Sequence, residues 1–403
     1  MRILIIHQNF PGQFRHLAKE WHRRPGWQVI GLGRDTAPGM ADIPWYKYRL
    51  HRKPHVRQHP YLRTMENAVL HGQAVARAML SLKAKGFVPD IIIAHPGWGE
   101  TLYAKDVFPQ ACLISFCEWY YDASHPDLFF DAEFPSNFDD RTRTHTWNAL
   151  HSLNLVDCDF AVSPTQWQRD RHPLPLRDKI SVIHEGIDTD ALNPDPQASV
   201  MLPSGMTLRA GDPVVTYVAR NLEPYRGFHS FMRMLALLQK EQADFHTLIV
   251  GGDDVSYGQR PANAANWREA LLQQTGLDLS RTHFTGKLPV NQYRRVLQIS
   301  SVHVYLTYPF VLSWSMLEAM ASGCLLVASR TPPVEEVIQH HTNGLLVDFF
   351  DYENIAATVL DTLNNHHNYQ SVRDRARQDI QRHYTLQQGI AGYDRLLHQA
   401  GIL

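Results

Sequence analysis

Arg220 and Arg226 lie six residues apart in the stretch ARNLEPYRGF, which follows a run of residues that predicts a β-strand. Guanidinium groups bind phosphate oxygens through pairs of parallel hydrogen bonds. Two guanidiniums that flank a strand-to-helix loop therefore suit a diphosphate. The alternative is that both are solvated surface arginines, and the spacing alone does not separate the two interpretations.

Glu318 is the single carboxylate of the stretch PFVLSWSMLEAMASG (309–323), which predicts a short apolar helix ended by a glycine. Ser313 and Ser315 are both candidate N-caps, and Ser315 with Glu318 also fits a capping box. The competing interpretation is functional. A carboxylate in such apolar surroundings suits a pair of ligand hydroxyls, and the free amides of the helix start suit an anion.

Two segments of the first half place candidate residues just after an expected strand. His95 ends the strand in IIIAHPGWGE, and Gly12 follows the first strand and opens a helix. Ligands of open α/β sheets bind beyond the carboxyl ends of the strands, which favours a functional histidine there. A glycine at a helix start lets backbone amides approach an anion. The alternatives are a structural histidine and an ordinary turn glycine.

Two segments of the second half follow the same pattern. Gly251 and Gly252 end the strand in LIVGGDD, and Lys287 and Leu288 follow the strand in THFTGKLP. Glycines beside a ligand let it lie against the backbone, although most strand-end glycines only turn the chain. The backbone of the loop at Lys287 and Leu288 could read the edge of a base.

Patterns that could bind a metal ion are weak. The triplets DCD (157–159) and DTD (188–190) match the Asp-x-Asp signature of metal-dependent sugar transfer, but DCD precedes its expected strand. Three histidines spaced by four lie within 51–59, where Pro54 and Pro60 disfavour a continuous helix. We expect no metal site and no cofactor. A single glycine after the first strand, in place of GxGxxG, also disfavours a nicotinamide-binding unit.

Two stretches break an otherwise even distribution of charge. Lys47–Arg63 carries six Lys/Arg, three His and no carboxylate, while Glu118–Asp140 carries seven carboxylates, many aromatic residues and no Lys/Arg. The basic stretch could meet anionic lipid headgroups, and a solvated loop is the preferred alternative. The acidic stretch could bind a sugar acceptor through Glu118, Trp119 and Tyr120, or it could be a packed surface loop.

The composition is that of an ordinary globular protein. The 403 residues carry a net charge of −1, which argues against a nucleic-acid binder. No stretch approaches the ~20 apolar residues that span a bilayer, and the start MRILIIHQNFPGQ is too quickly polar for a signal peptide. Four cysteines without a CxxC pair indicate reduced thiols in the cytoplasm.

Short Val/Ile/Leu runs alternate with longer helical patterns through both halves, which predicts parallel sheets covered on both faces. The length favours two domains, and Asp190–Pro213, rich in Pro, Gly and Ser, is the expected linker. The expected domains are 1–195 and 210–385. The expected strands are Arg2–Ile6, Gln28–Gly31, Asp90–Ala94, Cys112–Phe116, Phe160–Val162, Ile180–Ile183, Val214–Val218, Thr247–Val250, Thr282–Phe284, Val302–Leu306, Leu325–Ala328 and Leu345–Val347.

Taken together, the motifs resemble the retaining glycosyltransferases of family 4, which have the GT-B fold. The resemblance covers nearly the whole chain and keeps the motif order. It rests on the segments VIHEGIDTDALNP, ARNLEPYRG, GGDD, FTGKLP, LEAMASGCLLVAS and NGLLVDFFD. It implies two facing Rossmann-like domains with a deep cleft between them, and a terminal helix, 386–403, that packs back on the first domain.

The resemblance also implies roles for particular residues. Arg220 resembles the arginine that holds the donor diphosphate, and Arg226 stands at the place of the usual lysine. Glu318 resembles the glutamate that binds the ribose hydroxyls, Gly12 the glycine beside the phosphates, and His95 the histidine that approaches the donor sugar. The remaining expected donor-binding residues are Gly251, Gly252, Lys287, Leu288, Ser313, Trp314 and Ser315.

The sequence departs from the family at one important position. The family often carries two glutamates spaced by seven residues, and the first usually contacts the transferred sugar. Here Phe310 stands eight residues before Glu318, and it is followed by Val311, Leu312 and Ser313. The stretch PFVLSWS resembles a variant found in a subgroup of these transferases. The sequence therefore does not identify the transferred sugar.

The resemblance implies a metal-independent hexosyltransferase that moves a sugar from a UDP- or GDP-sugar to a carbohydrate, lipid-linked or protein acceptor, with retained configuration. Bacterial surface glycan or glycoconjugate synthesis is the expected setting. The alternatives are a nucleotide-sugar epimerase or hydrolase of the same fold, and a non-catalytic nucleotide-sugar binding protein. We expect a cytoplasmic protein and no nucleic acid as partner, with peripheral contact at the inner face of the membrane as the alternative to a solvated basic loop.

Overall fold

The computed structural model describes residues 1–122, 124–241 and 244–403. Ala123, which falls within the acidic aromatic stretch Glu118–Asp140, lies outside the described residues. Within the described part of the chain, no helix combines the length and the apolar character that a membrane crossing needs.

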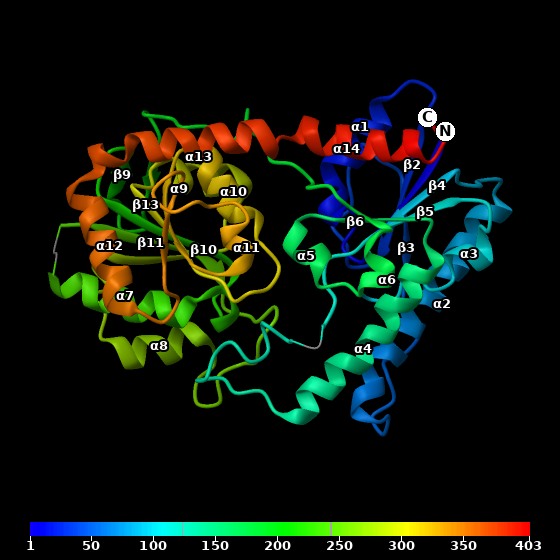
Figure 1. Cartoon of the computed structure of the whole chain (residues 1–403), viewed down its shortest axis with the longest axis horizontal. Helices are drawn as coiled ribbons and strands as arrows, with labels where there is room; N and C mark the ends of the chain where they lie inside the picture. The colour runs from blue at the N-terminus through cyan, green and yellow to red at the C-terminus, as the bar shows by residue number, and fades with distance from the viewer. Residues whose placement is uncertain (123, 242–243) are drawn as a thin grey trace. The chain divides into compact units, whose positions relative to one another are not determined.

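The chain divides into two compact units, each described here by itself. Unit 1 comprises Met1–Glu185 and Gly389–Leu403, and unit 2 comprises Gly186–Gln388. Each unit holds a parallel sheet with helices around it (Figure 1). The predicted fold class of two doubly wound α/β domains is therefore confirmed.

Unit 1 is built on a seven-stranded sheet in the order β3-β2-β1-β4-β5-β6-β7, and its neighbouring strands all pair in parallel. The strand order reverses between β1 and β4, so their carboxyl ends form the switch point at which such sheets bind ligands. The strands are β1 (Arg2–Ile6), β2 (Gln28–Arg34), β3 (Trp45–Tyr48), β4 (Ile91–Ala94), β5 (Cys112–Phe116), β6 (Phe160–Ser163) and β7 (Ile180–Val182).

Helices cover both faces of this sheet, because alternate residues of a strand point to opposite sides. Leu4 and Ile6 join one buried cluster, and Ile3 and Ile5 join the other. The helices of the first part of the chain are α1 (Arg15–Arg23), α2 (Arg63–Ala84), α3 (Ala104–Val107), α4 (Phe138–Asp157), α5 (Gln166–Asp170) and α6 (Leu174–Arg177).

The last helix, α14 (Leu386–Gln399), belongs to unit 1 from Gly389 onward. A Cβ at Gly389 would lie 2.7 Å from the carbonyl oxygen of His184, so glycine permits the close approach of the helix. Arg24, which directly follows α1, donates to both carboxylate oxygens of Asp394 at 2.8 Å. The buried side chains of α14 join the cluster that contains Ile3; they are Tyr393, Leu396 and Leu397.

Unit 2 is built on a six-stranded parallel sheet in the order β12-β11-β10-β13-β14-β15. Its strand order reverses between β10 and β13, which places a second switch point at their carboxyl ends. The strands are β10 (Val214–Asn221), β11 (His246–Gly252), β12 (Thr282–Gly286), β13 (Val302–Tyr305), β14 (Leu325–Ser329) and β15 (Leu345–Val347).

Two groups of helices cover the second sheet. Helices α7 and α8 lie on one side of it and α10 and α13 on the other (Figure 1), and α7 also packs against α12. The helices are α7 (Phe228–Glu241), α8 (Trp267–Thr275), α9 (Val290–Gln298), α10 (Trp314–Ala321), α11 (Pro332–Glu335), α12 (Tyr352–Asn364) and α13 (Gln370–His383).

The predicted linker Asp190–Pro213 is wrong. The segment lies inside unit 2 and forms an antiparallel hairpin of β8 (Ser199–Met201) and β9 (Thr207–Arg209). Leu202 and Leu208 anchor it, because both are buried in a cluster with residues of β10 and β11. Its Pro, Gly and Ser residues serve the turns, and the division between the units falls before the segment at 185/186.

All twelve predicted strands are present, with ends shifted by up to three residues. One strand of the first sheet, β3, was missed, because it is short, lies at the edge of the sheet and runs into the basic stretch Lys47–Arg63. In that stretch Arg52 pairs with Glu66 at 2.6 Å, and the Arg63 side chain donates to backbone carbonyls of the same loop.

Candidate functional site

Two histidines stand at the switch point of unit 1. His7 follows β1 directly and His95 follows β4, and their ring centroids lie 5.4 Å apart. Both side chains are buried, at 3% and 4% exposure. Sequence reasoning selected His95 and missed His7, although the same signal, a place directly after a parallel strand, marks both.

Backbone hydrogen bonds indicate the tautomer of each histidine. The Nδ1 atom of His7 accepts from the amide of Asn9 at 2.9 Å, and Nδ1 of His95 accepts from the amide of Gly97 at 3.1 Å. A neutral imidazole that accepts at Nδ1 carries its proton at Nε2. Both rings therefore present an Nε2–H as a donor.

Glu118 and Gln13 join the two histidines in a chain of hydrogen bonds. His7 donates from Nε2 to Oε1 of Gln13 at 2.6 Å, and Gln13 donates to Oε1 of Glu118 at 3.2 Å. His95 donates from Nε2 to Oε2 of Glu118 at 3.3 Å. Glu118 was expected at the acceptor and His95 at the donor sugar, and the structure brings these two predicted residues together.

Gly12 lies against His7. Its φ of +51° falls in the left-handed region, and a Cβ at this position would overlap the ring of His7. Both facts require glycine here. The amide of Gly12 donates to the carbonyl of Asn9 at 3.0 Å, so the contact with an anion that we expected must come from neighbouring amides and stays a prediction.

The other two acceptor candidates are packed. Trp119 is 7% exposed, and its ring lies 6.4 Å from that of Trp167. The hydroxyl of half-buried Tyr120 bonds to Ser152 on α4 at 3.2 Å. These contacts fit the packed-loop alternative, and the acceptor role stays a prediction.

The backbone of this loop is held at both ends by buried amide side chains. Gln168 donates to the carbonyl oxygen of Glu118 at 2.8 Å. Asn148 on α4 accepts from the amide of Tyr121 at 3.0 Å and donates to the carbonyl of the same residue at 2.6 Å. The backbone that carries the Glu118 side chain is therefore fixed by hydrogen bonds.

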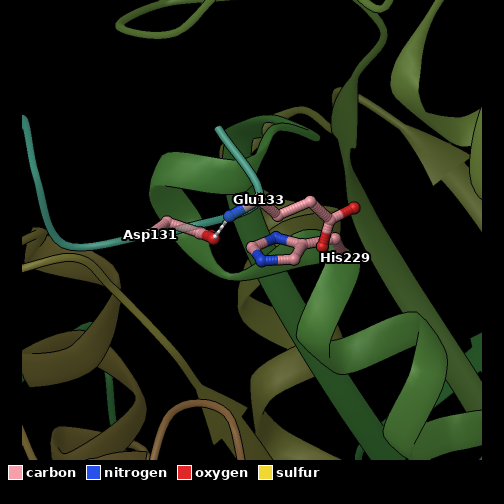
Figure 2. Close-up of side chains that lie close together, drawn as sticks. All are labelled: Asp131, Glu133 and His229. Carbon is pink, nitrogen blue, oxygen red and sulfur yellow. Dashed lines mark hydrogen bonds between the residues drawn. The ribbon is translucent and has the colours of Figure 1, made fainter. Parts of the chain in front are cut away.

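The acidic stretch also forms local turns. The Asp131 carboxylate accepts from the amide of Glu133 at 2.9 Å, as Figure 2 shows. His229, the third side chain in that view, stands at the start of α7 in unit 2. Because the three side chains come from two units, they carry no assignment of a metal site.

In unit 2, the two predicted diphosphate arginines have different environments. Arg220 is the next-to-last residue of β10 and is exposed, and it has no hydrogen-bond or ion-pair partner within the described part of the chain. Arg226 lies in a 3₁₀ turn (Pro224–Arg226) and is only 9% exposed. Its Nη1 atom donates to Oγ1 of Thr307 at 2.9 Å and to the carbonyl of Val311 at 2.8 Å.

Glu223 lies between these arginines, and sequence reasoning missed it. A carboxylate beside two arginines suggests an ion pair, but Glu223 accepts from three successive backbone amides at 3.0–3.1 Å, those of Ser256, Tyr257 and Gly258. It is 1% exposed. Its charge therefore fixes the loop after β11, and neither arginine neutralises it through direct contact.

The strand-end glycines lie in close contact with neighbouring groups. A Cβ at Gly251 would lie 2.6 Å from Cδ2 of Leu222, and one at Gly252 would overlap the side chain of Lys287. The end of β11 and the segment after β12 therefore lie side by side. Leu288 packs against the cluster beneath the β8–β9 hairpin. Whether these residues bind a base stays a prediction.

The capping box predicted as one alternative for Ser315 and Glu318 is wrong. Ser313 caps α10 by accepting from the amide of Ser315 at 3.3 Å, so Ser315 lies in the first turn. Glu318 then stands beyond the position from which a carboxylate reaches back to the cap. Its Oε2 instead accepts from the hydroxyl of Tyr293 at 2.6 Å.

Glu318 keeps one carboxylate oxygen available. It is half-buried, and Oε1 has no hydrogen-bond partner among the described residues. Burial raises the pKa of Glu318, and the hydrogen bond from Tyr293 partly opposes that rise. Trp314, the first residue of α10, is also half-buried and packs beside the core of unit 2. A carboxylate with one fixed and one available oxygen can accept a hydroxyl.

Phe310 is buried within the protein. It is 6% exposed, and its ring lies 5.0 Å from that of Tyr257 and 5.6 Å from that of Tyr225. The position that carries a sugar-binding carboxylate in the family is thus filled by a packed aromatic ring.

Comparison with known proteins agrees with this geometry. Residues 25–192 match the model of the glycosyl transferase family 4 group, and residues 206–379 match the model of glycosyl transferases group 1. A D-inositol 3-phosphate glycosyltransferase of Mycobacterium sp. (strain JLS) is 26% identical over 181 residues. That match spans 45% of this chain and only 38% of the relative.

Solved structures of the same fold cover the whole chain. Sucrose-phosphate synthase from Thermosynechococcus elongatus gives a TM-score of 0.73 at 16% identity and covers 99% of each chain. Anabaena HepE in complex with UDP-glucose gives a TM-score of 0.70 at 15% identity, with 99% of this chain and 100% of that one covered. With two family models that together span most of its length, the chain belongs to the family 4 group of GT-B glycosyltransferases.

Proposed function

We propose that the protein transfers a sugar from a UDP-sugar to a carbohydrate, lipid-linked or protein acceptor with retained configuration. One observation carries the donor part of this proposal. Arg220, a guanidinium without a partner among the described residues, lies at the carboxyl end of β10, and the segment after the neighbouring β13 leads into α10, which carries the available oxygen of Glu318. Cation and amides suit a diphosphate, and the carboxylate suits ribose hydroxyls.

Uridine is proposed as the base because HepE, a protein of the same fold, has been solved with UDP-glucose. The family resemblance supports retention, and hexose transfer in bacterial surface glycan synthesis is proposed on the same ground. The identity of the sugar stays open, because Phe310 replaces the carboxylate that would meet it.

The proposed chemistry is stabilisation of a leaving group. The bond between the anomeric carbon and the diphosphate oxygen breaks, and the acceptor hydroxyl oxygen bonds to the same face of that carbon. Its proton passes to the departing phosphate. Arg220 and the amides at the start of α10 stabilise the charge that develops on the diphosphate. His95, with its Nε2–H held by Glu118, is proposed to contact the donor sugar.

Metal independence is proposed because positive groups of the protein suffice for the diphosphate. One carboxylate of each Asp-x-Asp triplet has other partners. Asp159 accepts from Lys105 at 2.5 Å and from the amide of Leu113 at 2.8 Å, and Asp188 accepts from the amide of Ala191 at 3.0 Å.

A nucleotide-binding protein without transferase activity is the second candidate, and the packed Phe310 favours it. It predicts UDP binding with no loss of UDP-sugar in the presence of acceptor extracts. An epimerase or hydrolase would instead release an epimer or free sugar from the donor alone. Product analysis with and without acceptor separates the three.

Thermal unfolding in the presence of nucleotides tests which nucleotide the protein binds. UDP at about 100 times its Kd is expected to raise the stability of the folded protein by about 2.7 kcal/mol, because a ligand of the native state stabilises it by mass action. GDP, TDP and ADP at equal concentration should shift Tm less. EDTA should leave the UDP shift unchanged. A protein that responds to none of the four nucleotides would contradict the proposal.

Tyr293→Phe tests the ribose contact. Without its hydroxyl, the pKa of Glu318 should rise further, because the bond from Tyr293 favours the ionised carboxylate. We expect the Kd for UDP to rise, and this loss of affinity to shrink as pH rises and the carboxylate of the variant ionises. Titration calorimetry at a series of pH values measures it. Tyr369→Phe, which removes a hydroxyl bonded to exposed Asp361, is the control. If the Kd for UDP depends on pH in the same way in the two variants, the proposed contact of Glu318 with the ribose is contradicted.

A further inference from the structure

The guanidinium of Arg226 is used within the protein. A single nitrogen, Nη1, donates to Oγ1 of Thr307 and to the carbonyl of Val311, both within 2.9 Å. Both acceptors lie in the segment between β13 and α10. The side chain therefore ties two points of this segment to the turn after β10.

The tied segment leads directly into α10. Val311 stands two residues before Ser313, the N-cap, and the amide of Ser313 donates to the hydroxyl of Tyr305 at 3.0 Å. Helix starts bind anions through amides whose position depends on the cap. Whatever fixes Val311 therefore also fixes the first amides of α10.

The other side of the guanidinium faces an aromatic ring. Its central carbon lies 5.2 Å from the centroid of Tyr257, the residue whose amide is held by the Glu223 carboxylate. The hydrogen-bond partners of Arg226 among the described residues are neutral, and no carboxylate there lies within ion-pair distance of it. The group is thus oriented by neutral acceptors and a ring, while its charge stays uncompensated by direct contact.

A lysine could donate to both oxygens from its single nitrogen, but it could not reproduce the whole arrangement. Its ammonium is a point donor on a flexible stem and lacks the flat face that stacks on an aromatic ring. The two positions at which this chain departs from the family, Arg226 and Phe310, both contact Tyr257. They therefore belong to one packed arrangement.

We propose that Arg226 is a positioning residue. It fixes segment 307–313 so that the start of α10 is held in the geometry that receives the donor diphosphate, while Arg220 supplies the unpaired cation. This inference rests on the proposed function, because the segment it fixes is the proposed donor site.

Arg226→Lys is the direct test, because it keeps the charge and removes the planar contacts. The Kd for UDP, measured by calorimetry, is expected to rise about tenfold or more. Deuterium uptake at amides 312–316, measured by mass spectrometry without nucleotide, should rise at the same time. Wild-type affinity together with wild-type uptake would overturn the inference, since Arg226 would then act only as a charge.

Thr307→Val is the second variant and leaves the arginine in place. It changes the side-chain volume little and removes the hydroxyl that accepts from Arg226 and that also donates to the carbonyl of Tyr225 at 3.5 Å. Deuterium uptake at amides 312–316 and the Kd for UDP should therefore both rise. Combined with Arg226→Lys, the two losses should be less than additive, because both break one contact. Additive losses would mean that Arg226 and Thr307 act independently, which would contradict the proposed contact between them. If Arg226→Lys does not fold, Thr307→Val alone decides.

The two proposals fail differently. If the wild-type protein binds no nucleotide, the proposed function fails, and deuterium uptake without ligand still tests whether Arg226 holds the segment. If UDP binds the wild type and both variants equally and deuterium uptake at amides 312–316 is also unchanged, the donor proposal stands and the positioning role of Arg226 is rejected.

Discussion

Arg220→Ala is expected to lower kcat/KM about 10²–10³-fold while Tm stays near the wild-type value. The size follows from the loss of a preorganised cation at a developing charge in the transition state. Arg220 is exposed and has no partner in the described part of the chain, so its removal breaks no contact of the folded protein.

The kinetic signature distinguishes a transition-state contact from simple donor binding. If Arg220 stabilises the leaving diphosphate, kcat should fall together with kcat/KM, whereas a contact that binds donor and transition state equally would raise KM alone. Arg220→Lys should recover only part of the activity, because an ammonium cannot bind phosphate in bidentate fashion.

Arg260→Ala is the matched control. Arg260 also lies in unit 2 and is exposed, but its guanidinium pairs with exposed Asp254 at 3.1 Å. Its loss should change kcat/KM by less than about twofold. Near-normal kinetics in Arg220→Ala, or equal losses in the two variants, would remove the diphosphate assignment.

The strands could be predicted because each is a continuous apolar run. RILII and IIIA are buried on both faces, and such runs need no other signal. The missed strands β3, β8 and β9 are short and partly exposed, so their composition resembled loops. Residues after strand ends, such as His95, were found because the sheet topology places them at one edge.

Burial of polar side chains could not be predicted from spacing. Arg220 and Arg226 look equivalent in ARNLEPYRG, and the difference arises from Thr307 and Val311, more than 80 residues away along the chain. The hydrogen bond from Tyr293 to Glu318 also joins residues far apart in the sequence. The capping box, which was predicted in its place, depends only on residues three apart.

The second large effect concerns a carboxylate outside the predicted site. Glu100 follows β4 and is fully buried. Its Oε1 accepts from the hydroxyl of Tyr48 at 2.8 Å, and His71 lies 3.6 Å away. Its Oε2 has no hydrogen-bond partner among the described residues. Burial raises the pKa of Glu100 to about 7 and lowers the pKa of His71 to about 4.

The raised pKa of Glu100 gives stability a definite pH dependence. Between about pH 4.5 and pH 7 the folded protein keeps a proton on Glu100 that the unfolded chain has released. The folded state then binds more protons, so the free energy of unfolding falls as pH rises through this window. His71, with its lowered pKa, contributes in the opposite direction between about pH 4 and 6.5.

Glu100→Gln should therefore stabilise unit 1 at neutral and alkaline pH. The amide oxygen can still accept from Tyr48, and no charge is buried above pH 7. We expect the variant to exceed the wild type by about 3 kcal/mol at pH 8, since a shift of about 2.5 pH units corresponds to that energy. The difference in the free energy of unfolding between variant and wild type should become small near pH 5. The contribution of His71 largely cancels in this difference, because both proteins carry that residue.

Native-state hydrogen exchange at the amides of β4, compared at equal pH, measures this difference in unit 1 without requiring the whole chain to unfold in one step. Glu66→Gln is the control with the opposite sign, because the bond from Arg52 lowers the pKa of that carboxylate and its loss should destabilise at neutral pH. If Glu100→Gln is no more stable than the wild type at pH 8, Glu100 is ionised and compensated in the folded protein. In that case a further hydrogen-bond donor, such as a bound water molecule, must contact Oε2 and stabilise the ionised carboxylate.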